Sequence, residues 1–326
     1  MSKQSTATDR LDAAARPIAE TRAKAPEPRF HITNYALLLK PRVMSLVVFT
    51  AAAGMFLGAG TSGAAAIDPV RATVAIFCIA IGAGASGAIN MWCDRDIDLH
   101  MLRTRHRPLP AGRLDPREAL AFGVFLALGS VAAMAQWVNW VSSALLAVTI
   151  LYYVFIYTVW LKRRTPHNIV IGGVSGALPP VIGWAAVTGD VGLGAVLLFA
   201  IIFLWTPPHT WALALFRRGD YEAAGVPMLP VVAGEKETKR QMLIYTAILI
   251  PATLLPMMIG MSGVVYGITA IVLGAGLARH AWRVWKDDSG PNGGKTARPM
   301  FLFTILYLFL IFAGLLADRL LFVAIF

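Results

Sequence analysis

Polar side chains recur every four residues where a long apolar segment ends and a run of arginines begins. Asn90, Asp94 and Asp98 lie in the stretch AINMWCDRDIDLHMLRTRHRPLP. On one helix, residues four and eight apart share a face, so we expect a single polar stripe, with Asp96 pointing elsewhere. Like charges this close to hydrocarbon predict a cation between Asp94 and Asp98. Oxygen ligands without Cys or His favour Mg²⁺ over Zn²⁺.

A second acidic loop, FRRGDYEAAGVPMLPVVAGEKETKRQ at residues 216–241, follows a later apolar segment. We expect the two loops to face each other across a central cavity, so that Asp94, Asp98 and Asp220 share one or two Mg²⁺ ions. Basic side chains near these acids are suited to pair with the oxygens of a diphosphate held by the metal. Contact with lipid head groups is the alternative role for each of them. They are Arg95, Arg103, Arg107, Lys162 and Arg217.

The composition defines the elements that must position these groups. The chain has 326 residues, of which 57% are hydrophobic and 14% charged, and its mean hydropathy is +0.64. These values are typical of a polytopic membrane protein and exclude a soluble globular domain. The apolar stretches show no strand alternation, so we predict an all-α fold with nine transmembrane helices around a central cavity. The predicted spans are 43–61, 72–92, 118–137, 141–160, 169–187, 191–212, 242–260, 264–282 and 300–323.

The basic residues predict the orientation, because cytoplasmic loops of membrane proteins are rich in Lys and Arg. Here 27 of the 29 basic residues fall on one side if the N-terminus is cytoplasmic, and only Arg71 and Arg319 fall on the other. Nine spans then place the C-terminus outside. The net charge of +11 is explained by topology and anionic lipid rather than by nucleic acid. We predict a disordered cytoplasmic tail over residues 1–32 and a membrane domain over residues 33–326.

A charged site at the mouth of an apolar cavity fits an isoprenyl diphosphate, whose hydrocarbon tail can lie between helices. Metal and arginines neutralise the departing diphosphate, the allylic C–O bond ionises, and an electron-rich partner attacks the carbocation. A dry cavity protects this cation from water. Two proline pairs, Pro179-Pro180 and Pro207-Pro208, predict helix breaks in the cavity wall, because proline removes backbone hydrogen bonds that lipid cannot replace.

The motif N-x-x-x-D-x-x-x-D at Asn90, Asp94 and Asp98 resembles the first acidic motif of the UbiA superfamily of intramembrane prenyltransferases. Three further blocks resemble the branch of that superfamily that farnesylates heme. The blocks are RTRHRPLP (103–110), LKRRTPHNIVIGGVSGALPPVIGWAA (161–186) and TPPHTWALALFRRGDYEAAGVPMLPVV (206–232). The resemblance covers residues 33–320.

The resemblance implies transfer of farnesyl from farnesyl diphosphate to the 2-vinyl group of protoheme IX, with addition of water, giving heme O and diphosphate. Mg²⁺ is then the cofactor, whereas heme b is a substrate. The resemblance also implies a bacterial inner membrane or, alternatively, a mitochondrial inner membrane. Heme A synthase or a terminal oxidase is the implied partner.

Site residues follow from the same resemblance, by matching position. The catalytic positions are matched by Asn90, Asp94, Asp98 and Asp220, and the three acids are the implied metal ligands. Polar positions around the head group are matched by Arg103, Arg107, Lys162, Arg217 and Tyr221. His209, in the TPPH block, is the candidate for contact with heme, as an iron ligand or through a propionate. A hydrogen bond from His209 to a carbonyl freed by the prolines is the alternative.

One departure bears on the acceptor. Superfamily members that act on quinone precursors usually show D-x-x-x-D in the second loop, whereas Ala224 stands four residues after Asp220 here. The heme branch shares this lack. Three alternatives stay open: a prenyltransferase for a quinone or chlorophyll precursor, an ion-coupled transporter, and a heme-handling assembly protein without catalysis. The span interiors between 118 and 212 lack charged residues, which disfavours the transporter.

Overall fold

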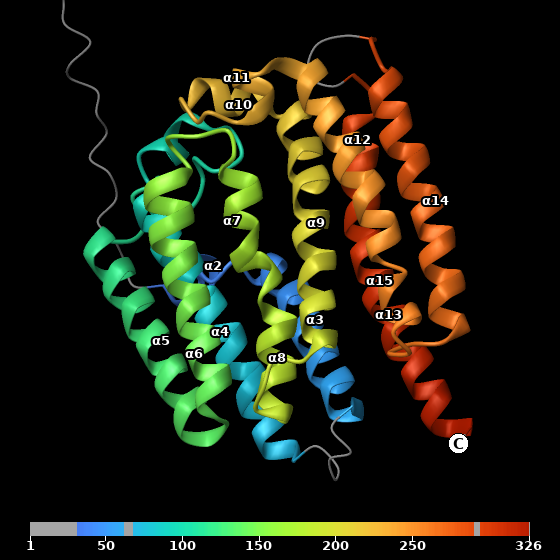
Figure 1. The fold of residues 1–326 in the computed structure, drawn as a ribbon. Coiled ribbons are helices and arrows are strands. Elements are labelled where there is room, and N and C mark those ends of the chain that lie inside the picture. The colour runs from blue at the N-terminus through green and yellow to red at the C-terminus, as the bar shows by residue number, and fades with distance from the viewer. Residues whose placement is uncertain (1–30, 62–67, 290–293, 326) are drawn as a thin grey trace, which may run out of the picture.

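The computed structural model describes residues 31–61, 68–289 and 294–325, and helices make up the regular structure of these segments. Nine of the described helical segments are long and apolar enough to cross a membrane, which confirms the predicted fold (Figure 1). The C-terminal end of the last helix lies at the opposite end of the bundle from the short helices of the second acidic loop. Which end faces the cytoplasm stays a prediction from the charge pattern.

The helical elements follow one another along the whole described chain, and they are labelled as in Figure 1. The fourth, fifth and seventh spans each consist of two successive elements: α6 with η2, α7 with α8, and α12 with α13. The bounds are α2 (Ile32–Leu38), α3 (Pro41–Thr61), α4 (Pro69–Cys93), η1 (Ile97–His100), α5 (Pro116–Trp137), α6 (Trp140–Leu151), η2 (Tyr152–Leu161), α7 (Asn168–Ala177), α8 (Pro179–Thr188), α9 (Leu193–Phe216), α10 (Arg218–Ala223), α11 (Leu229–Val232), α12 (Gly234–Ala252), α13 (Leu255–Met258), α14 (Val264–Lys286) and α15 (Ala297–Ile325).

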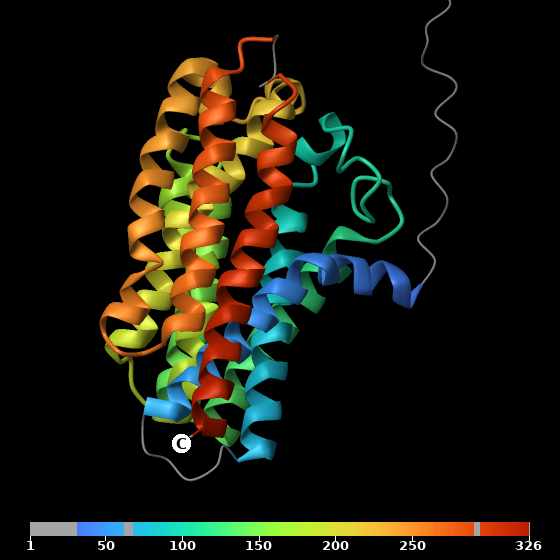
Figure 2. The same ribbon diagram turned by 90° about the vertical axis from the view of Figure 1, so that its right-hand side faces the viewer.

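The predicted tail, residues 1–32, lies outside the described residues except for its last two positions, and α2 begins at Ile32. Figure 2 shows α2 lying across the bundle axis rather than along it. It packs against α4 through Leu38, and it contacts α5 through Tyr35: the Tyr35 ring packs edge-on against Phe122 at 5.1 Å, and the Tyr35 hydroxyl donates to Glu118 at 2.9 Å. This contact fixes the chain just before it enters the first span.

The two proline pairs have different effects on their helices. The fifth span is broken as predicted, because Pro179 and Pro180 lack the N–H groups that would continue α7. The prediction of a break at Pro207-Pro208 is wrong, since α9 runs through both prolines. There both rings are buried, and the surrounding turns of a long, well-packed helix hold the backbone in place.

The second half of the fourth span, η2, is a π-helix, which the sequence did not indicate. Its wider turns pair residues five apart: the Thr158 hydroxyl donates to Tyr153 O at 2.9 Å, and the Lys162 N–H donates to Tyr157 O at 2.9 Å. Such stretches are rare and often occur at functional sites. In this chain η2 turns Thr158 and Lys162 toward the end of α4.

Candidate active site

The acidic stripe does not lie on one continuous helix, which corrects the prediction. α4 ends at Cys93, and Asp94 is the first residue beyond it. Two backbone hydrogen bonds keep the four-residue spacing: the Asp94 N–H donates to Asn90 O at 2.9 Å, and the Asp98 N–H donates to Asp94 O at 2.8 Å. The Thr104 hydroxyl donates a hydrogen bond to Asp98 O at 3.0 Å. In a continuing helix, a backbone N–H would bond this carbonyl instead.

Asp94 is completely buried and lies among polar groups from two other positions of the chain. Its Oδ2 accepts hydrogen bonds from Asn90 Nδ2 at 2.8 Å and from Lys162 Nζ. Its Oδ1 has no hydrogen-bond partner in the described part of the chain. A buried charge is tolerated only when it is paired, so Lys162 is the group that stabilises a carboxylate here.

Lys40 is a site residue that the sequence analysis missed. Its Nζ donates to Asn90 Oδ1 at 2.7 Å. Asn90 Nδ2 also lies 3.2 Å from Thr158 Oγ1, so the amide of Asn90 is bonded on every side. Asn90 therefore holds Lys40 and Asp94 next to each other. The available signal was position alone, because Lys40 immediately precedes the first span at the same end of the bundle as the acids.

The backbone of Lys40 is strained, with a φ of 51°. This left-handed conformation costs a residue other than glycine about 1–3 kcal/mol. Pro41, which follows Lys40, normally favours an extended conformation of the residue before it. Such strain is common where a side chain must reach a functional site. Burial, followed by the charges of Arg107 and Lys162, lowers the pKa of Lys40 to about 7.

Asp98 is buried as well, and it has its own cationic partner. Its Oδ2 accepts a hydrogen bond from Arg107 at 2.7 Å, and only 3% of its side chain is exposed. Arg107 itself is 23% exposed. Protein cations thus occupy the positions beside Asp94 and Asp98 where the sequence predicted a positive charge.

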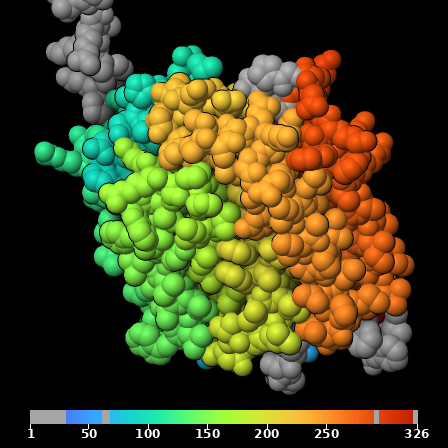
Figure 3. Space-filling model, turned by 45° about the horizontal axis from the view of Figure 1, so that its top comes forward, coloured from blue at the N-terminus to red at the C-terminus, as the bar shows by residue number. Residues whose placement is uncertain are grey.

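The second acidic loop lies beside the first at the same end of the bundle (Figures 1 and 3). Asp220 is nearly buried, but its Oδ2 accepts no hydrogen bond, and the nearest described cation, Arg217, stays 3.7 Å away. Burial raises the pKa of Tyr221, while the charges of Arg103 and Lys162 oppose that rise. Tyr221 therefore lies within electrostatic reach of the first loop.

Arg95 lies apart from the acids, so its role at the diphosphate stays a prediction. Its guanidinium donates to the Trp92 carbonyl at 2.6 Å and covers the Trp92 ring at 4.7 Å. It follows Asp94 directly and so points to another side of the turn, away from the acids. Asp96 also lies apart, as expected: it is 61% exposed and pairs with Arg163 at 2.6 Å.

The donor set fits a metal that arrives with its substrate. Among the described residues, no group of three or more His, Cys, Asp or Glu side chains is close enough to hold a metal ion alone. Mg²⁺ usually binds through one or two carboxylates together with substrate phosphates and water. Two buried oxygens without partners, Asp94 Oδ1 and Asp220 Oδ2, fit this role. Sharing of one ion by Asp94, Asp98 and Asp220 stays a prediction.

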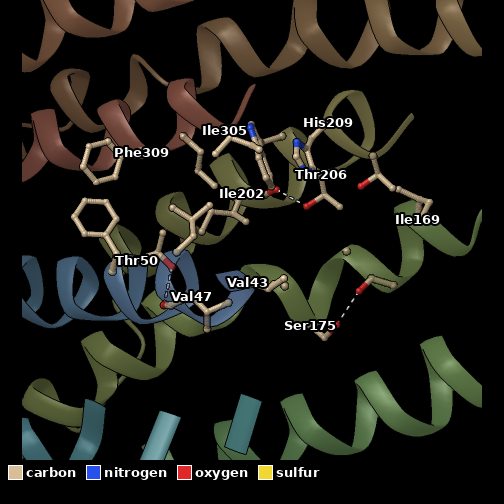
Figure 4. A pocket seen from close by; sticks show the side chains of 18 of the residues that line it. Val43, Val47, Thr50, Ile169, Ser175, Ile202, Thr206, His209, Ile305 and Phe309 are labelled. Carbon is tan, nitrogen blue, oxygen red and sulfur yellow. Dashed lines mark hydrogen bonds between the residues drawn. The ribbon is translucent and has the colours of Figure 1, made fainter. Parts of the chain in front are cut away.

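An apolar cavity of about 740 Å³ lies between the helices, within the size range of small-molecule sites, and no acid is among its lining residues. Its walls come from α3, η2, α7, α9 and α15, and Figure 4 shows side chains of α3, α7, α9 and α15 around it. Tyr157 links the two regions, because its ring lines the cavity and its carbonyl accepts the Lys162 N–H. A charged site thus stands at one end of an apolar space.

His209 lines this cavity on α9 (Figure 4), with its ring between Trp205 at 4.2 Å and Phe301 at 4.8 Å. The Thr304 hydroxyl donates its only proton to Phe301 O at 2.6 Å, yet it also lies 2.8 Å from His209 Nδ1. With the hydroxyl proton on Phe301 O, Nδ1 is the atom that carries the proton of this bond. In the neutral ring, Nε2 then has a free lone pair, and no described residue occupies it. The predicted alternative, a bond to a freed backbone carbonyl, is wrong, because the partner is a hydroxyl.

Two comparisons with curated proteins cover nearly the whole chain. A protoheme IX farnesyltransferase from Parvibaculum lavamentivorans is 56% identical over 87% of this chain and 88% of its own length. A protein of the same name from Azorhizobium caulinodans is 55% identical over 88% of this chain and 92% of its own. These relatives therefore match the described fold from end to end rather than one motif.

Solved structures share the fold at lower identity. A digeranylgeranylglyceryl phosphate synthase superposes with a TM-score of 0.71 at 18% identity, covering 87% of this chain and 98% of that one. A UbiA homolog from Archaeoglobus fulgidus bound to GPP and Mg²⁺ gives a TM-score of 0.58 at 18% identity, covering 86% and 99%. At this identity the likeness concerns the fold.

The fold and the site together define a class, the integral-membrane proteins that hold a charged group at the mouth of an apolar cavity between helices. The sequence pattern of the UbiA prenyltransferase family matches residues 47–305. With relatives above half identity over most of its length, the chain belongs to the UbiA prenyltransferase family.

Proposed function

We propose that this chain transfers the farnesyl group of farnesyl diphosphate to the 2-vinyl group of protoheme IX, with addition of water, giving heme O and diphosphate. The observation that carries the proposal is the 56% identity, over 87% of the chain, to a protoheme IX farnesyltransferase. The structure supports it with a cationic site beside a cavity of about 740 Å³. A diphosphate head and a hydrocarbon tail require this combination.

The diphosphate binds among the basic groups that surround Asp94. Lys40, Arg107 and Lys162 pair with its oxygens, replacing part of their bonds to Asn90, Asp98 and Asp94. Asp94 Oδ1 and Asp220 Oδ2 are the atoms that would hold Mg²⁺. When bound, Mg²⁺ neutralises charge on the departing diphosphate.

The hydrocarbon reacts at the cavity side of this site. The C–O bond of the allylic diphosphate breaks, and both electrons leave with the diphosphate. The Tyr153 and Tyr157 rings, 5.3 Å apart, line the adjoining cavity wall and offer π faces to the allylic cation. The vinyl group then supplies two electrons to the new C–C bond, and water adds to the resulting cation with loss of a proton. The apolar walls keep water scarce before that step.

His209 is the group we assign to the heme iron. In the tautomer with the proton on Nδ1, Nε2 can bind a metal and cannot donate to a propionate, which favours ligation over contact with a carboxylate. We expect His209→Ala to change the visible and EPR spectra of heme-bound protein, and added imidazole to restore them. Unchanged spectra would remove His209 from the site.

The topology proposal follows the basic loops. We place the acids at the cytoplasmic face of a bacterial inner membrane, with the C-terminal end of α15 outside. Heme O released there passes to a heme A synthase or a terminal oxidase. Labelling of single cysteines at either end of the bundle, in intact cells, tests this orientation.

The decisive experiment is reconstitution. Purified protein in lipid nanodiscs is incubated with protoheme, farnesyl diphosphate and Mg²⁺, and the products are separated and weighed by mass spectrometry. We expect heme O, and no product when a chelator removes Mg²⁺. Folded protein that makes no heme O, but prenylates a quinone precursor such as 4-hydroxybenzoate, would refute the proposed acceptor.

A further inference from the structure

Gly176 differs from the other glycines of the cavity wall because nothing fills the space beside it. Gly172, Gly173 and Gly176 lie on the face of α7 that lines the cavity. A Cβ at Gly172 would overlap the Tyr157 ring, and a Cβ at Gly173 would lie 3.3 Å from Thr206. A Cβ at Gly176 would meet no atom of the described residues within 4 Å. Protein packing therefore accounts for the first two glycines and leaves Gly176 unexplained.

The backbone does not require glycine at this position either. Gly176 lies inside the last turn of α7, and its φ is not in the left-handed region. Glycine is a poor helix former, so alanine would be the better residue here for the helix alone. Glycine at this position leaves empty the space that a larger side chain would occupy.

This space lies away from the Ile169 end of α7. Gly176 is an exposed residue seven positions beyond Ile169, a distance of about 10 Å along the helix. Phe49 of α3 and Phe309 of α15, whose rings lie 4.8 Å apart, line another part of the cavity. Ile202 of α9 lines the cavity as well. Figure 4 shows Ile202 and Phe309 on the side of the cavity away from Ile169.

The helices α3 and α8 are in direct contact a few residues beyond Gly176. A Cβ on Gly54 would overlap the backbone of Pro180, and a Cβ on Gly183 would overlap the carbonyl of Ala51. An extended chain that runs from the acids along α7 therefore passes the space beside Gly176 about 10 Å from Ile169.

We propose that Gly176 sets the length of the prenyl chain that the cavity accepts. This inference rests on the proposed function, in which the head group binds at Asp94 and Lys162 and the tail runs down the cavity. A distal isoprene unit of the tail then occupies the space beside Gly176. A larger side chain at position 176 fills this space and excludes longer tails by steric clash.

The test compares Gly176→Leu with Gly129→Leu. Gly129 lies in α5 and is exposed on the outside of the bundle, and a Cβ added there would likewise meet no described atom within 4 Å. It therefore controls for adding leucine to a membrane helix. Binding and turnover are measured with dimethylallyl, geranyl and farnesyl diphosphates in the presence of protoheme and Mg²⁺. We expect Gly176→Leu to shift the preference for geranyl over farnesyl diphosphate by about 10–100-fold, and Gly129→Leu to leave it unchanged.

Other results overturn the inference. Equal losses with all three diphosphates in Gly176→Leu would place the heme, not the tail, at this depth. An unchanged preference in a folded variant would show that the space is not used. If Gly176→Leu does not fold, Gly176→Ala and Gly176→Val give the same comparison with smaller steps. If the wild-type protein makes no heme O, the proposed function fails, and competition between the three diphosphates for binding still tests the role of Gly176.

Discussion

The carboxylates of the two acidic loops differ in how closely protein cations pair with them. In the first loop, Asp94 and Asp98 are buried and each is bound to a cation, Lys162 and Arg107 respectively. In the second loop, Asp220 has a buried oxygen without a hydrogen bond, and Arg217 stays 3.7 Å away. Each acid of the first loop therefore has a close protein cation, whereas Asp220 has only a distant one, and Asp94 Oδ1 and Asp220 Oδ2 both lack a hydrogen bond.

Because of this difference, we expect substitutions in the two loops to have different effects on the free energy of unfolding and on turnover. A buried ion pair that loses one partner leaves an uncompensated charge, so changes in the first loop should affect the fold as well as the reaction. Asp220 has only a long ion pair with the partly exposed Arg217, which contributes little to the folded state, so a change in the second loop should affect the reaction alone. Comparing matched Asp→Asn variants tests this view directly.

The largest effect is expected for Asp94→Asn. The turnover of protoheme should fall by about 10²–10³-fold, because the site loses a charge that acts on the metal and the head group. The free energy of unfolding should also fall by about 3–5 kcal/mol, since Lys162 stays buried without its partner. Heme O formation and unfolding in mixed micelles measure the two effects.

A double variant controls for the pair. Asp94→Asn with Lys162→Met removes both charges and should recover most of the lost stability, while turnover stays low. If Asp94→Asn alone is as stable as the wild-type protein, the buried pair does not stabilise the fold and the comparison fails.

Asp220→Asn should lower turnover by a similar factor, about 10²-fold, with a change of less than about 0.5 kcal/mol in the free energy of unfolding. The variant should also need more Mg²⁺ for half-maximal rate, because Asp220 Oδ2 is a proposed ligand. Glu222→Gln is the matched control, since Glu222 is an exposed acid of the same loop. Equal destabilisation by Asp220→Asn and Asp94→Asn would contradict the distinction between the loops.

A substitution of Lys40 tests whether the diphosphate site includes the residue just before α3. Lys40→Met should raise the KM for farnesyl diphosphate by about 10–100-fold, the worth of one charge-assisted hydrogen bond. Because burial lowers the pKa of Lys40 to about 7, the wild-type ammonium is charged below this pH and becomes neutral above it. The KM should therefore rise between pH 7 and 9.

Lys40→Arg separates this effect from the titration of the substrate, since a guanidinium stays charged over the whole range. We expect its KM to show a smaller rise above pH 7 than that of the wild-type protein. The groups that face Lys40 are Asp94, Asp98, Arg107 and Lys162. Identical pH profiles for the two proteins would exclude Lys40 as the titrating group.

Much of the fold and of the first loop could be predicted from the sequence. Spans of about 20 apolar residues and the grouping of basic residues can be identified directly in the sequence, because they depend only on local composition. The proximity of Asp94 and Asp98 could be predicted from their spacing, whereas their roles in binding stay predictions. The contact of Arg95 with Trp92 could not be predicted, since it depends on how the turn after Cys93 is formed.

The missed features all depend on packing between distant segments. The role of Lys40 requires its positive φ and its contact with Asn90, fifty residues away. The proton position of His209 depends on Thr304, ninety-five residues away. The open space beside Gly176 appears only once α3, α9 and α15 surround it, because a glycine in a sequence gives no sign of what its missing side chain leaves free.

The smallest effect is expected for Asp96→Asn, the acid outside both sites. The hydrogen bond from Arg163 lowers the pKa of Asp96 from 3.8 to about 2, so the pair stabilises the fold fully above pH 4 and loses this contribution as the pH falls toward 2. At 61% exposure of Asp96, solvent screening keeps the contribution below about 1 kcal/mol. Turnover should match that of the wild-type protein, and the small difference in unfolding should shrink with acid or added salt. A tenfold loss of turnover in Asp96→Asn would mean that the first site extends to this side of the turn, and that the contrast between paired and unpaired acids does not define the catalytic groups.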